Sequence, residues 1–251
     1  MDETTGGADG GACGEVPYRT GDVLRMECPF TSAAVTAVGR YHVAVRWPWW
    51  EVDTEARGIE WNGDIALPTP ADHGWTDSYF RTVPPEEELR AGDRCLVGIA
   101  PTVVHVLAVD HFDPPLETGW LPRPAAYIEF LLQGQSFDPE LEEQGHTVDP
   151  AGGEPVRFAL LFRPYAFLEN GDDLVDHDGR AWRFDGPWDW HPYDGGPADA
   201  PAWPLHLLHR DGDPAPDEIA AVAAATATGS HADVAARWAE LTHASPLPTR
   251  N

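Results

Sequence analysis

The first residues that could perform chemistry lie within or directly after one apolar run, residues 95–109. They are His105, Asp110, His111 and Asp113, and all four are types that bind divalent metals. Along an extended strand each residue advances roughly 3.3 Å, so His105 and His111 would lie about 20 Å apart and could not share an ion. His111 and Asp113 alone are too few ligands for a site. We therefore expect no bound metal.

The motifs that name common reactions are missing. The sequence contains no Gly-rich phosphate loop, no Gly-x-Ser-x-Gly turn, no His-Glu-x-x-His pair and no Cys-x-x-Cys. The acidic segment 172–179 places Leu174 where a calcium loop needs its first oxygen ligand. Cys13, Cys28 and Cys95 are odd in number and lack metal-ligand spacing, so we expect free thiols. These absences favour a non-catalytic protein without a cofactor.

Two groups of arginines could form an anion site. Segments 40–46 and 157–163 share the pattern Arg, aromatic, any, aliphatic, any, apolar, Arg. Every second side chain of a strand shares a face, and arginine binds carboxylate or phosphate with two parallel hydrogen bonds. Because the chain has 42 acidic residues, we favour cross-strand pairing of these arginines with Asp or Glu. The candidates for binding a small anionic ligand, as an alternative, are Arg40, His42, Arg46, Arg157 and Arg163.

Tryptophan-rich loops offer a second kind of site. Exposed tryptophan is the commonest anchor of protein interfaces, so a partner-binding role is our first hypothesis. Near carboxylates such as Glu51, Asp53 or Asp189, tryptophan also binds sugars, and paired carboxylates hydrolyse glycosides. A glycan or hydrolytic site is therefore the alternative. The candidate residues for partner binding are Trp47, Trp49, Trp50, Trp188 and Trp190.

The charge balance points to the class of partner. The formal net charge is −26, and all 16 basic residues are arginine. Such a charge repels nucleic acid and anionic membranes and steers a basic protein toward the chain, although biased nucleotide composition or adaptation to salt would also produce it. No apolar run resembles a signal or a membrane span. We therefore expect a cytoplasmic binding protein of the inhibitor or immunity type, with a basic protein partner.

One stretch organises the expected fold. Residues 95–109 are nearly uncharged and rich in β-branched side chains. From Val103 to Val109, apolar residues occupy both the odd-numbered and the even-numbered positions, which predicts a strand covered on both faces. Pro101 predicts a bend in that strand, or two strands in place of one. We expect His105 to be buried there and satisfied by a hydrogen bond.

Turn formers and alanine-rich segments complete the prediction. With 25 Pro and 24 Gly, the chain favours many short elements over a helix bundle. We predict a mainly β (α+β) fold, with an antiparallel sheet, sandwich or barrel-like core and long Pro/Trp-rich loops. Residues 217–226 and 230–242 predict a small C-terminal helical hairpin, and residues 138–145 predict a short surface helix.

The same patterns suggest a domain organisation. We expect a disordered tail over 1–15, a β-rich domain over 16–212, and the helical hairpin with its tail over 213–251. Segments 40–46 and 157–163 each lead to a Gly-x-x-Trp, at Trp61 and Trp182. This match suggests two similar modules, about 20–90 and 150–210, that share the central strand 95–109.

Overall fold

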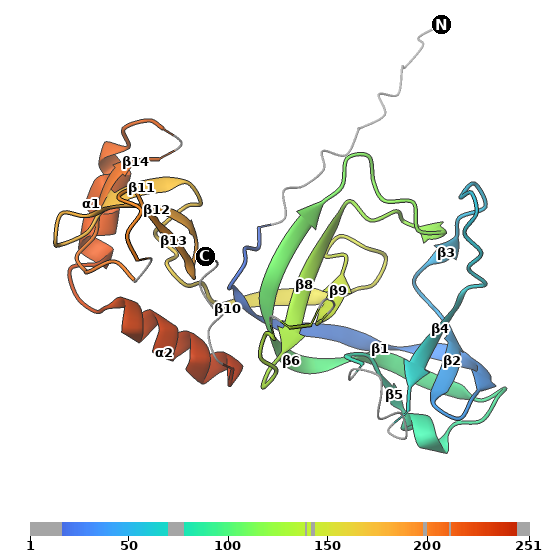
Figure 1. The fold of residues 1–251 in the computed structure, drawn as a ribbon. Helices are drawn as coiled ribbons and strands as arrows, with labels where there is room; N and C mark the ends of the chain where they lie inside the picture. Colours follow the sequence, from blue (N-terminus) through green and yellow to red (C-terminus); the bar gives the residue numbers. More distant parts are fainter. Residues whose placement is uncertain are drawn as a thin grey trace, which may run out of the picture.

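The computed structural model describes residues 17–69, 78–138, 140–141, 144–197, 200–210 and 212–244. The expected tail 1–15 lies outside these residues. The described chain is mainly β, with antiparallel, curled sheets and two C-terminal helices (Figure 1). The predicted fold class is therefore confirmed.

Two long strands carry the larger sheet. They are β1 (Val23–Val38) and β6 (Arg94–His111), which pair antiparallel at its centre. The strand order is β4-β2-β1-β6-β8-β9, while β10 also pairs with β1 and β5 with β6. The remaining bounds are β2 (His42–Arg46), β4 (Asp64–Pro68), β5 (Arg81–Val83), β8 (Ala126–Leu132), β9 (His146–Val148) and β10 (Arg157–Phe162), with a 3-10 turn at Glu86–Glu88.

Prolines bend these long strands without ending them. The register of β1 on β6 shifts between Met26 and Cys28, and again between Cys28 and Thr31. Pro29 and Pro101 lie at these shifts, where a ladder tolerates a residue that has no N–H. The bent-strand alternative predicted from Pro101 is therefore the correct one.

The central strand has both faces covered, as its sequence predicts. Val104 and Val106 lie in a first hydrophobic core inside the curled sheet. On the opposite face, Val103 packs against a second core, and His105 contacts the ring of Trp238. Side chains at odd-numbered and even-numbered positions of β6 point to opposite faces, and each face meets its own core. Apolar residues are therefore needed at both sets of positions.

The second core belongs to a smaller sheet with the order β13-β12-β11-β14. Its strands are β11 (Asp172–Val175), β12 (Ala181–Gly186), β13 (Asp189–Pro192) and β14 (His206–His209). Helices α1 (Pro216–Ala225) and α2 (His231–Thr242) add Val222 and Trp238 to this core. Val23 of β1 also belongs to it, so the long strands join the two cores.

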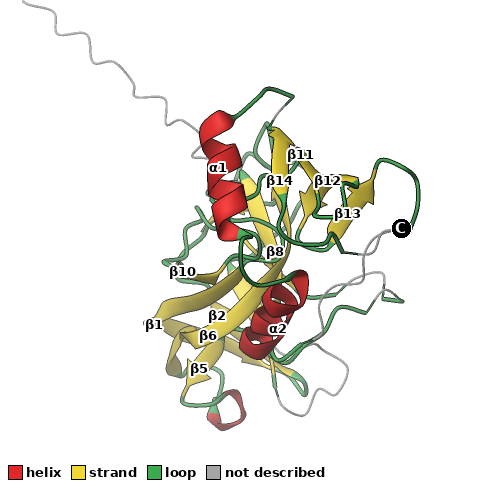
Figure 2. Cartoon of the chain, turned by 90° about the vertical axis from the view of Figure 1, so that its left-hand side faces the viewer, coloured by secondary structure: helices red, strands yellow, loops and turns green. Residues whose placement is uncertain are grey.

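The C-terminal helical hairpin forms close to its predicted bounds. Ser230 caps α2 by accepting a hydrogen bond from the backbone N–H of Asp233. Figure 2 shows α1 beside β14 and α2 lying against the larger sheet, where it contacts β6 and β1. The helix predicted over 138–145 is wrong for the described part of that segment, which forms a turn closed by the Leu141 N–H and the Asp138 carbonyl.

The matched segments of the suspected repeat lie in one sheet. Strands β2 and β10 both pair with β1, β2 near its C-terminal end and β10 near its N-terminal end. The two tryptophans are placed differently, because Trp61 packs against the first core and Trp182 lies within the second. The division into two similar modules stays a prediction.

Candidate functional site

Three of the tryptophans expected at an interface are core residues. Trp188 and Trp190 are 7% and 2% exposed, and they surround Tyr165 in the second core. Trp47 is 4% exposed in the first core. The expectation that these three are exposed anchors is corrected by the structure, because each packs in an apolar core: Trp47 in the first, and Trp188, in the turn before β13, and Trp190, within β13, in the second.

The other two tryptophans are half-buried and lead to a more accessible cluster. Trp49 packs beside Trp47 and Phe80, with ring centroids 4.9 Å and 5.6 Å away, respectively. Trp50 stacks on Trp120, at 4.7 Å between centroids and 7° between ring planes. Stacking of this kind contributes about 0.5–1.5 kcal/mol beyond burial.

A short two-stranded ribbon holds this cluster. Strand β3 (Glu51–Val52) pairs with β7 (Trp120–Leu121), and Val52 lies opposite Trp120. Trp61 lies 6.0 Å from Trp50 and 6.1 Å from Trp120, measured between ring centroids. We call Trp50, Val52, Ile59, Trp61 and Trp120 the aromatic ribbon. Val52 is 45% exposed and Ile59 is 40% exposed, so the ribbon presents apolar surface to solvent.

A glycine lets this cluster close. Gly119 has a φ of +88° and lies directly under Ile59. A Cβ at position 119 would come within 2.5 Å of Ile59 Cγ2, a distance that would push the side chain away. Only glycine therefore satisfies both the backbone conformation and the close approach at this position.

An ion pair between the buried Asp53 and the partly exposed Arg123 fixes the base of the ribbon. Arg123 Nε donates to Asp53 Oδ2 at 2.8 Å, and the Glu55 backbone N–H donates to Asp53 Oδ1 at 2.9 Å. The Glu55 N–H and then the Arg123 guanidinium lower the pKa of the Asp53 carboxyl. Because Asp53 is already paired, it is a structural acid and not a free partner for Glu51 in a glycan site.

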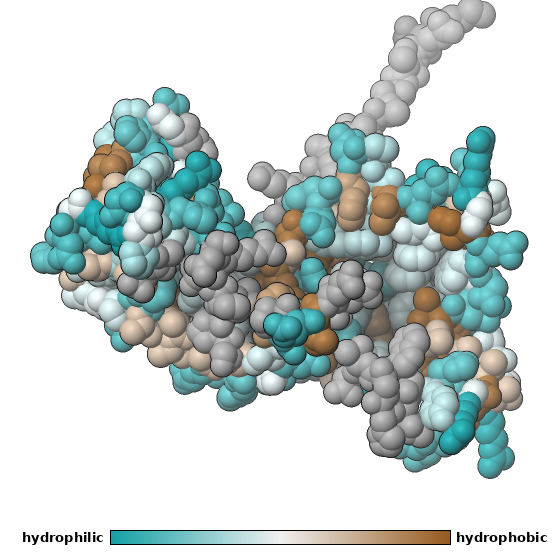
Figure 3. All heavy atoms as spheres, viewed as in Figure 1, coloured by the Kyte–Doolittle hydropathy of each residue, from teal (hydrophilic) through white to brown (hydrophobic). Residues whose placement is uncertain are grey.

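Acidic side chains surround the ribbon. We call Glu51, Glu55, Glu60 and Glu117 the acidic rim; all four are exposed, and none has an ion pair within 4.0 Å among the described residues. Figure 3 shows brown apolar surface beside teal hydrophilic surface in the region of β3. This surface combines an apolar centre with four exposed carboxylates.

The candidate arginines do not converge on an anion site. Arg46 pairs with Asp64 at 3.0 Å, and Arg163 makes two hydrogen bonds to the fully buried Asp22 at 2.8 Å and 2.6 Å. Arg40 lies 4.8 Å from the ring centroid of Tyr41. The set is also split between the two ends of β1, with Arg40, His42 and Arg46 in or next to β2, and Arg157 and Arg163 in or next to β10.

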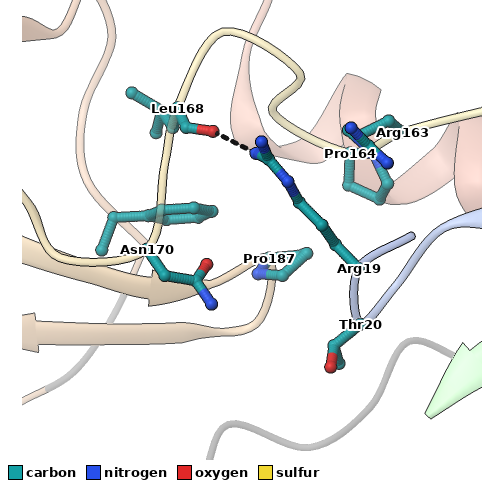
Figure 4. Close-up of a pocket in the computed structure, with 8 residues that line it drawn as sticks. Arg19, Thr20, Arg163, Pro164, Leu168, Asn170 and Pro187 are labelled. Atoms are coloured by element: carbon teal, nitrogen blue, oxygen red, sulfur yellow. Dashed lines mark hydrogen bonds between the residues drawn. The ribbon is translucent and has the colours of Figure 1, made fainter. Parts of the chain in front are cut away.

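A small pocket beside Arg163 is neutralised by the chain itself. It lies where Arg19 crosses toward the segment that carries Leu168 and Asn170 (Figure 4). Arg19 Nη1 donates to the Leu168 carbonyl at 2.9 Å, and Arg19 Nη2 lies 2.5 Å from Glu169 Oε2. With Arg163 bound to Asp22, neither guanidinium of this pocket is left uncompensated for an anionic ligand.

Behind the ribbon lies a set of buried titratable groups. Glu154 is 9% exposed, and its burial raises the pKa of its carboxyl, while hydrogen bonding by the Trp50 indole opposes that rise. Burial also raises the pKa of Asp149. A buried carboxyl with a raised pKa can act as a general acid in other proteins. Here the loop 149–154 lies close under Trp49 and Trp50, since a Cβ at Gly153 would come within 2.6 Å of the Trp49 carbonyl oxygen.

The nearby cysteine is not a nucleophile. Burial, with the negative charge of Glu154, raises the pKa of Cys28 to about 12. The thiolate is the reactive form of cysteine, so Cys28 stays protonated and unreactive at neutral pH. Cys28 and Cys95 are both buried free thiols.

No cluster of three or more His, Cys, Asp or Glu that could hold a metal ion occurs among the described residues. His111 is exposed at the end of β6, whereas His105 is buried. Within the same described ranges, no helix has the length and apolar character that a membrane span requires.

His105 corrects one expectation from the sequence. It is 1% exposed in β6, as predicted, but neither ring nitrogen has a hydrogen-bond partner among the described residues. Its ring instead meets the ring of Trp238 edge-on, at 4.9 Å between centroids. Burial lowers the pKa of His105 from 6.5 to about 4.

This histidine should make stability depend on pH. The unfolded chain binds a proton at position 105 below pH 6.5, whereas the folded chain does so only below about 4. Folding stability supplied by neutral His105 is therefore fully present above pH 6.5 and is lost as the pH falls toward 4, by about 3 kcal/mol in total. Urea unfolding of wild type and of His105→Leu across this range isolates the effect, because both proteins share all other titrating groups. Parallel curves for the two proteins would contradict it.

The chain has no detected relatives. No protein-family model matches its sequence. No curated protein and no solved structure is significantly similar to it either. Its site must therefore be argued from its own residues.

Sequence reasoning missed most of the aromatic ribbon. Trp50 was a candidate, but Val52, Ile59 and Trp120 were not. Trp120 lies far from Trp50 in the chain, in a segment where Pro114, Pro115, Pro122 and Pro124 predict a rigid connection. No local signal brings the two together, since their stacking depends on the pairing of β3 with β7.

Proposed function

We propose that this chain is a non-catalytic, acidic binding protein that engages a basic protein partner through the aromatic ribbon. One observation carries the proposal: the half-buried stack of Trp50, Trp61 and Trp120 supports exposed Val52 and Ile59 within a rim of four unpaired glutamates. Binding hot spots are typically aromatic centres from which neighbouring contacts exclude water. A rim of negative charge selects an arginine- or lysine-rich surface around an apolar anchor.

The net charge supports the same class of partner. With a formal net charge of −26, the whole chain attracts a basic protein and repels nucleic acid. At physiological ionic strength the screening length is about 8 Å, so the rim mainly sets the association rate. An inhibitor- or immunity-like role in the cytoplasm, which depends on fast capture of a basic protein, fits this arrangement.

The alternatives have weaker support. An arginine-lined anion site would need guanidinium groups that converge, and Arg46 and Arg163 are each occupied by a carboxylate. A hydrolytic tryptophan–carboxylate site would need a second free acid to act together with Glu51. Asp53 is paired with Arg123, and Glu154 is covered.

A matched pair of valine substitutions tests the docking surface. Val52 in β3 and Val83 in β5 are similarly exposed, at 45% and 51%. Proteins captured from cell lysate on the wild-type chain at low salt should be basic. Affinity for an isolated captured partner should fall by at least tenfold with Val52→Asp, because the charge disrupts an apolar contact worth more than about 1.4 kcal/mol. Val83→Asp should leave the affinity unchanged, and equal loss with both variants would contradict the proposal.

Neutralising the acidic rim should change the association rate of the partner. The fourfold variant Glu51→Gln, Glu55→Gln, Glu60→Gln, Glu117→Gln should slow association and flatten the salt dependence while changing dissociation little. Surface plasmon resonance at several salt concentrations measures both rates. A rim variant with an unchanged association rate would separate the charge from recognition and contradict this part of the proposal.

A further inference from the structure

One outward-facing part of the larger sheet carries almost no acidic side chains. It is formed by β4, β2 and β5 together with residues 30–36 of β1 and 94–98 of β6. Alternate side chains of these strands, such as that of Val35, point into the first core. Asp64 is the one acid among the side chains that point outward in these segments, and it pairs with Arg46 at 3.0 Å. This surface therefore lacks the excess of negative charge that the whole chain carries.

Three apolar side chains form the centre of this surface. Leu96 lies opposite Val83 across the ladder of β6 and β5, and these side chains are 41% and 51% exposed. Phe30 of β1 is 38% exposed and covers Gly98, where a Cβ would come within 2.9 Å of Phe30 Cγ. Because β1, β6 and β5 are neighbours here, the three side chains form one apolar patch.

Two arginines flank this patch and have no acidic neighbour opposite them in the ladder. Arg94 lies opposite Ala34, and Arg81 lies opposite Gly98. Arg94 donates to Ser32 Oγ at 3.0 Å, which holds its side chain against the sheet. Both arginines are exposed, and neither has an ion pair within 4.0 Å among the described residues. We call Phe30, Arg81, Val83, Arg94 and Leu96 the basic face.

The acids nearest to the basic face in the chain make no ion pair with it. Asp93 precedes Arg94, but its carboxylate accepts a hydrogen bond from the Arg90 backbone N–H at 2.8 Å. Glu87 and Glu88 are exposed in the 3-10 turn that follows β5. The basic face therefore presents two exposed guanidinium groups beside an apolar centre on an otherwise acidic protein.

Neither of the two described helices covers the basic face. Helix α1 contacts β14, and α2 contacts β6 at His105, which lies beyond the bend at Pro101. The exposure of Val83, Leu96 and Phe30 agrees with this arrangement. The basic face is thus an unpartnered part of the sheet.

The aromatic ribbon has the complementary pattern. It exposes Val52 and Ile59 among the glutamates of the acidic rim, whereas the basic face exposes apolar side chains between arginines. Two apolar centres exclude water from each other, and opposite charges at their edges fix how the surfaces meet. Figure 1 shows β3, which holds Val52, above β1 and shows β5 below it, so one chain cannot join its own two surfaces.

We propose that the basic face binds the aromatic ribbon of a second copy of this chain. The inference rests on the proposed role of the ribbon as a docking surface. Each contact joins two different surfaces, so a pair of copies keeps one free ribbon and one free basic face. A symmetric contact between two basic faces is disfavoured, because it would bring arginine against arginine.

The charge of the whole chain limits the strength of this contact. Two copies with a net charge of −26 each repel at long range, but charges beyond about 8 Å are largely screened at physiological ionic strength. The side chains at the contact therefore decide whether it forms, and we expect weak self-association that depends on concentration. Since the contact covers the ribbon, a second copy competes with the basic protein partner for it.

Analytical ultracentrifugation of the full chain at physiological ionic strength tests the contact. The wild-type sedimentation coefficient should rise with concentration. Val52→Asp places a charge in the apolar centre of the ribbon and Val83→Asp in that of the basic face, so each should weaken self-association at least tenfold. Leu208→Asp is the matched control, since Leu208 is 41% exposed in β14, and it should associate as the wild type does. A wild-type chain that stays monomeric at every concentration would overturn the proposal.

Mixing the two valine variants makes the test independent of folding defects. Val52→Asp keeps an intact basic face, and Val83→Asp keeps an intact ribbon. An equimolar mixture should therefore form a dimer and no larger species, because the other surface of each variant is blocked. Misfolded variants could not regain association on mixing, and a mixture that stays monomeric would overturn the proposal.

The outcomes also separate this inference from the proposed function. A monomeric wild type whose Val52→Asp variant loses affinity for a basic partner would overturn the self-association alone. Measurements of partner affinity use chain concentrations well below the self-association range, where Val83→Asp has no effect on the ribbon. Self-association that Val52→Asp leaves unchanged would show that another surface is used and would overturn the inference.

Discussion

Replacing Arg163 with methionine is expected to lower the free energy of unfolding by about 3–5 kcal/mol. Asp22 is fully buried, and Arg163 gives it two hydrogen bonds at 2.8 Å and 2.6 Å. Methionine fills similar space but leaves the buried carboxylate without its counter-charge. Arg163 also donates to the Pro17 carbonyl, so the substitution additionally frees the segment that enters β1.

Two further variants test whether the cost of Arg163→Met comes from the buried charge of Asp22. The double variant Asp22→Asn, Arg163→Met should recover part of the loss, because the unpaired charge is removed. Arg46→Met breaks the more exposed pair with Asp64, in which the arginine side chain is 56% exposed, and should cost at most about 1 kcal/mol. Urea denaturation of the four proteins provides the measurements. Similar losses for Arg46→Met and Arg163→Met would show that burial of Asp22 does not determine the cost.

Replacing Trp238 with alanine is expected to cost about 3–5 kcal/mol. Trp238 is fully buried, it contacts Trp188 and His105, and its indole N–H donates to the Gly21 carbonyl at 2.9 Å. The substitution therefore removes the main contact of α2 with the second core and with the start of β1. Denaturant unfolding followed by far-ultraviolet circular dichroism measures the loss.

The matched control for Trp238→Ala is an exposed apolar residue in the smaller sheet. Leu208 in β14 is 41% exposed, so Leu208→Ala should change the free energy of unfolding by no more than about 0.5 kcal/mol. Trp238→Ala should also raise the pKa of His105 toward its ordinary value, because the ring that buries it is gone. Near-wild-type stability of Trp238→Ala would show that α2 contributes little to the second core.

Elements with a strong local pattern could be predicted from the sequence. The alternation in segment 40–46 predicts Val43 and Val45 on one face and Arg46 on the other, and in β2 the two valines are buried while Arg46 is exposed. The Asp178-Gly179 turn between β11 and β12 was also found, because a glycine with a φ of +82° satisfies the hairpin. The capping serine similarly fixed the start of α2.

Features that depend on distant pairing could not be predicted. The burial of Trp188 and Trp190 requires β12 and two helices to enclose them, and an aromatic loop looks the same in sequence whether it is covered or not. The ribbon needs β3 and β7 to meet across a long separation in the chain. His105 was expected to find a hydrogen bond because most buried polar groups do, and nothing local shows that Trp238 takes that place.

The position of β1 has a consequence for synthesis on the ribosome. This strand is made early, yet one edge needs β6 and the other needs β10, which is translated much later. Until residue 162 has emerged, the part of β1 that holds Leu24 and Met26 has no neighbour on the β10 side. A nascent chain must therefore keep an apolar strand edge unpaired until β10 has been translated, which is a window for association with chaperones or with other unfinished chains.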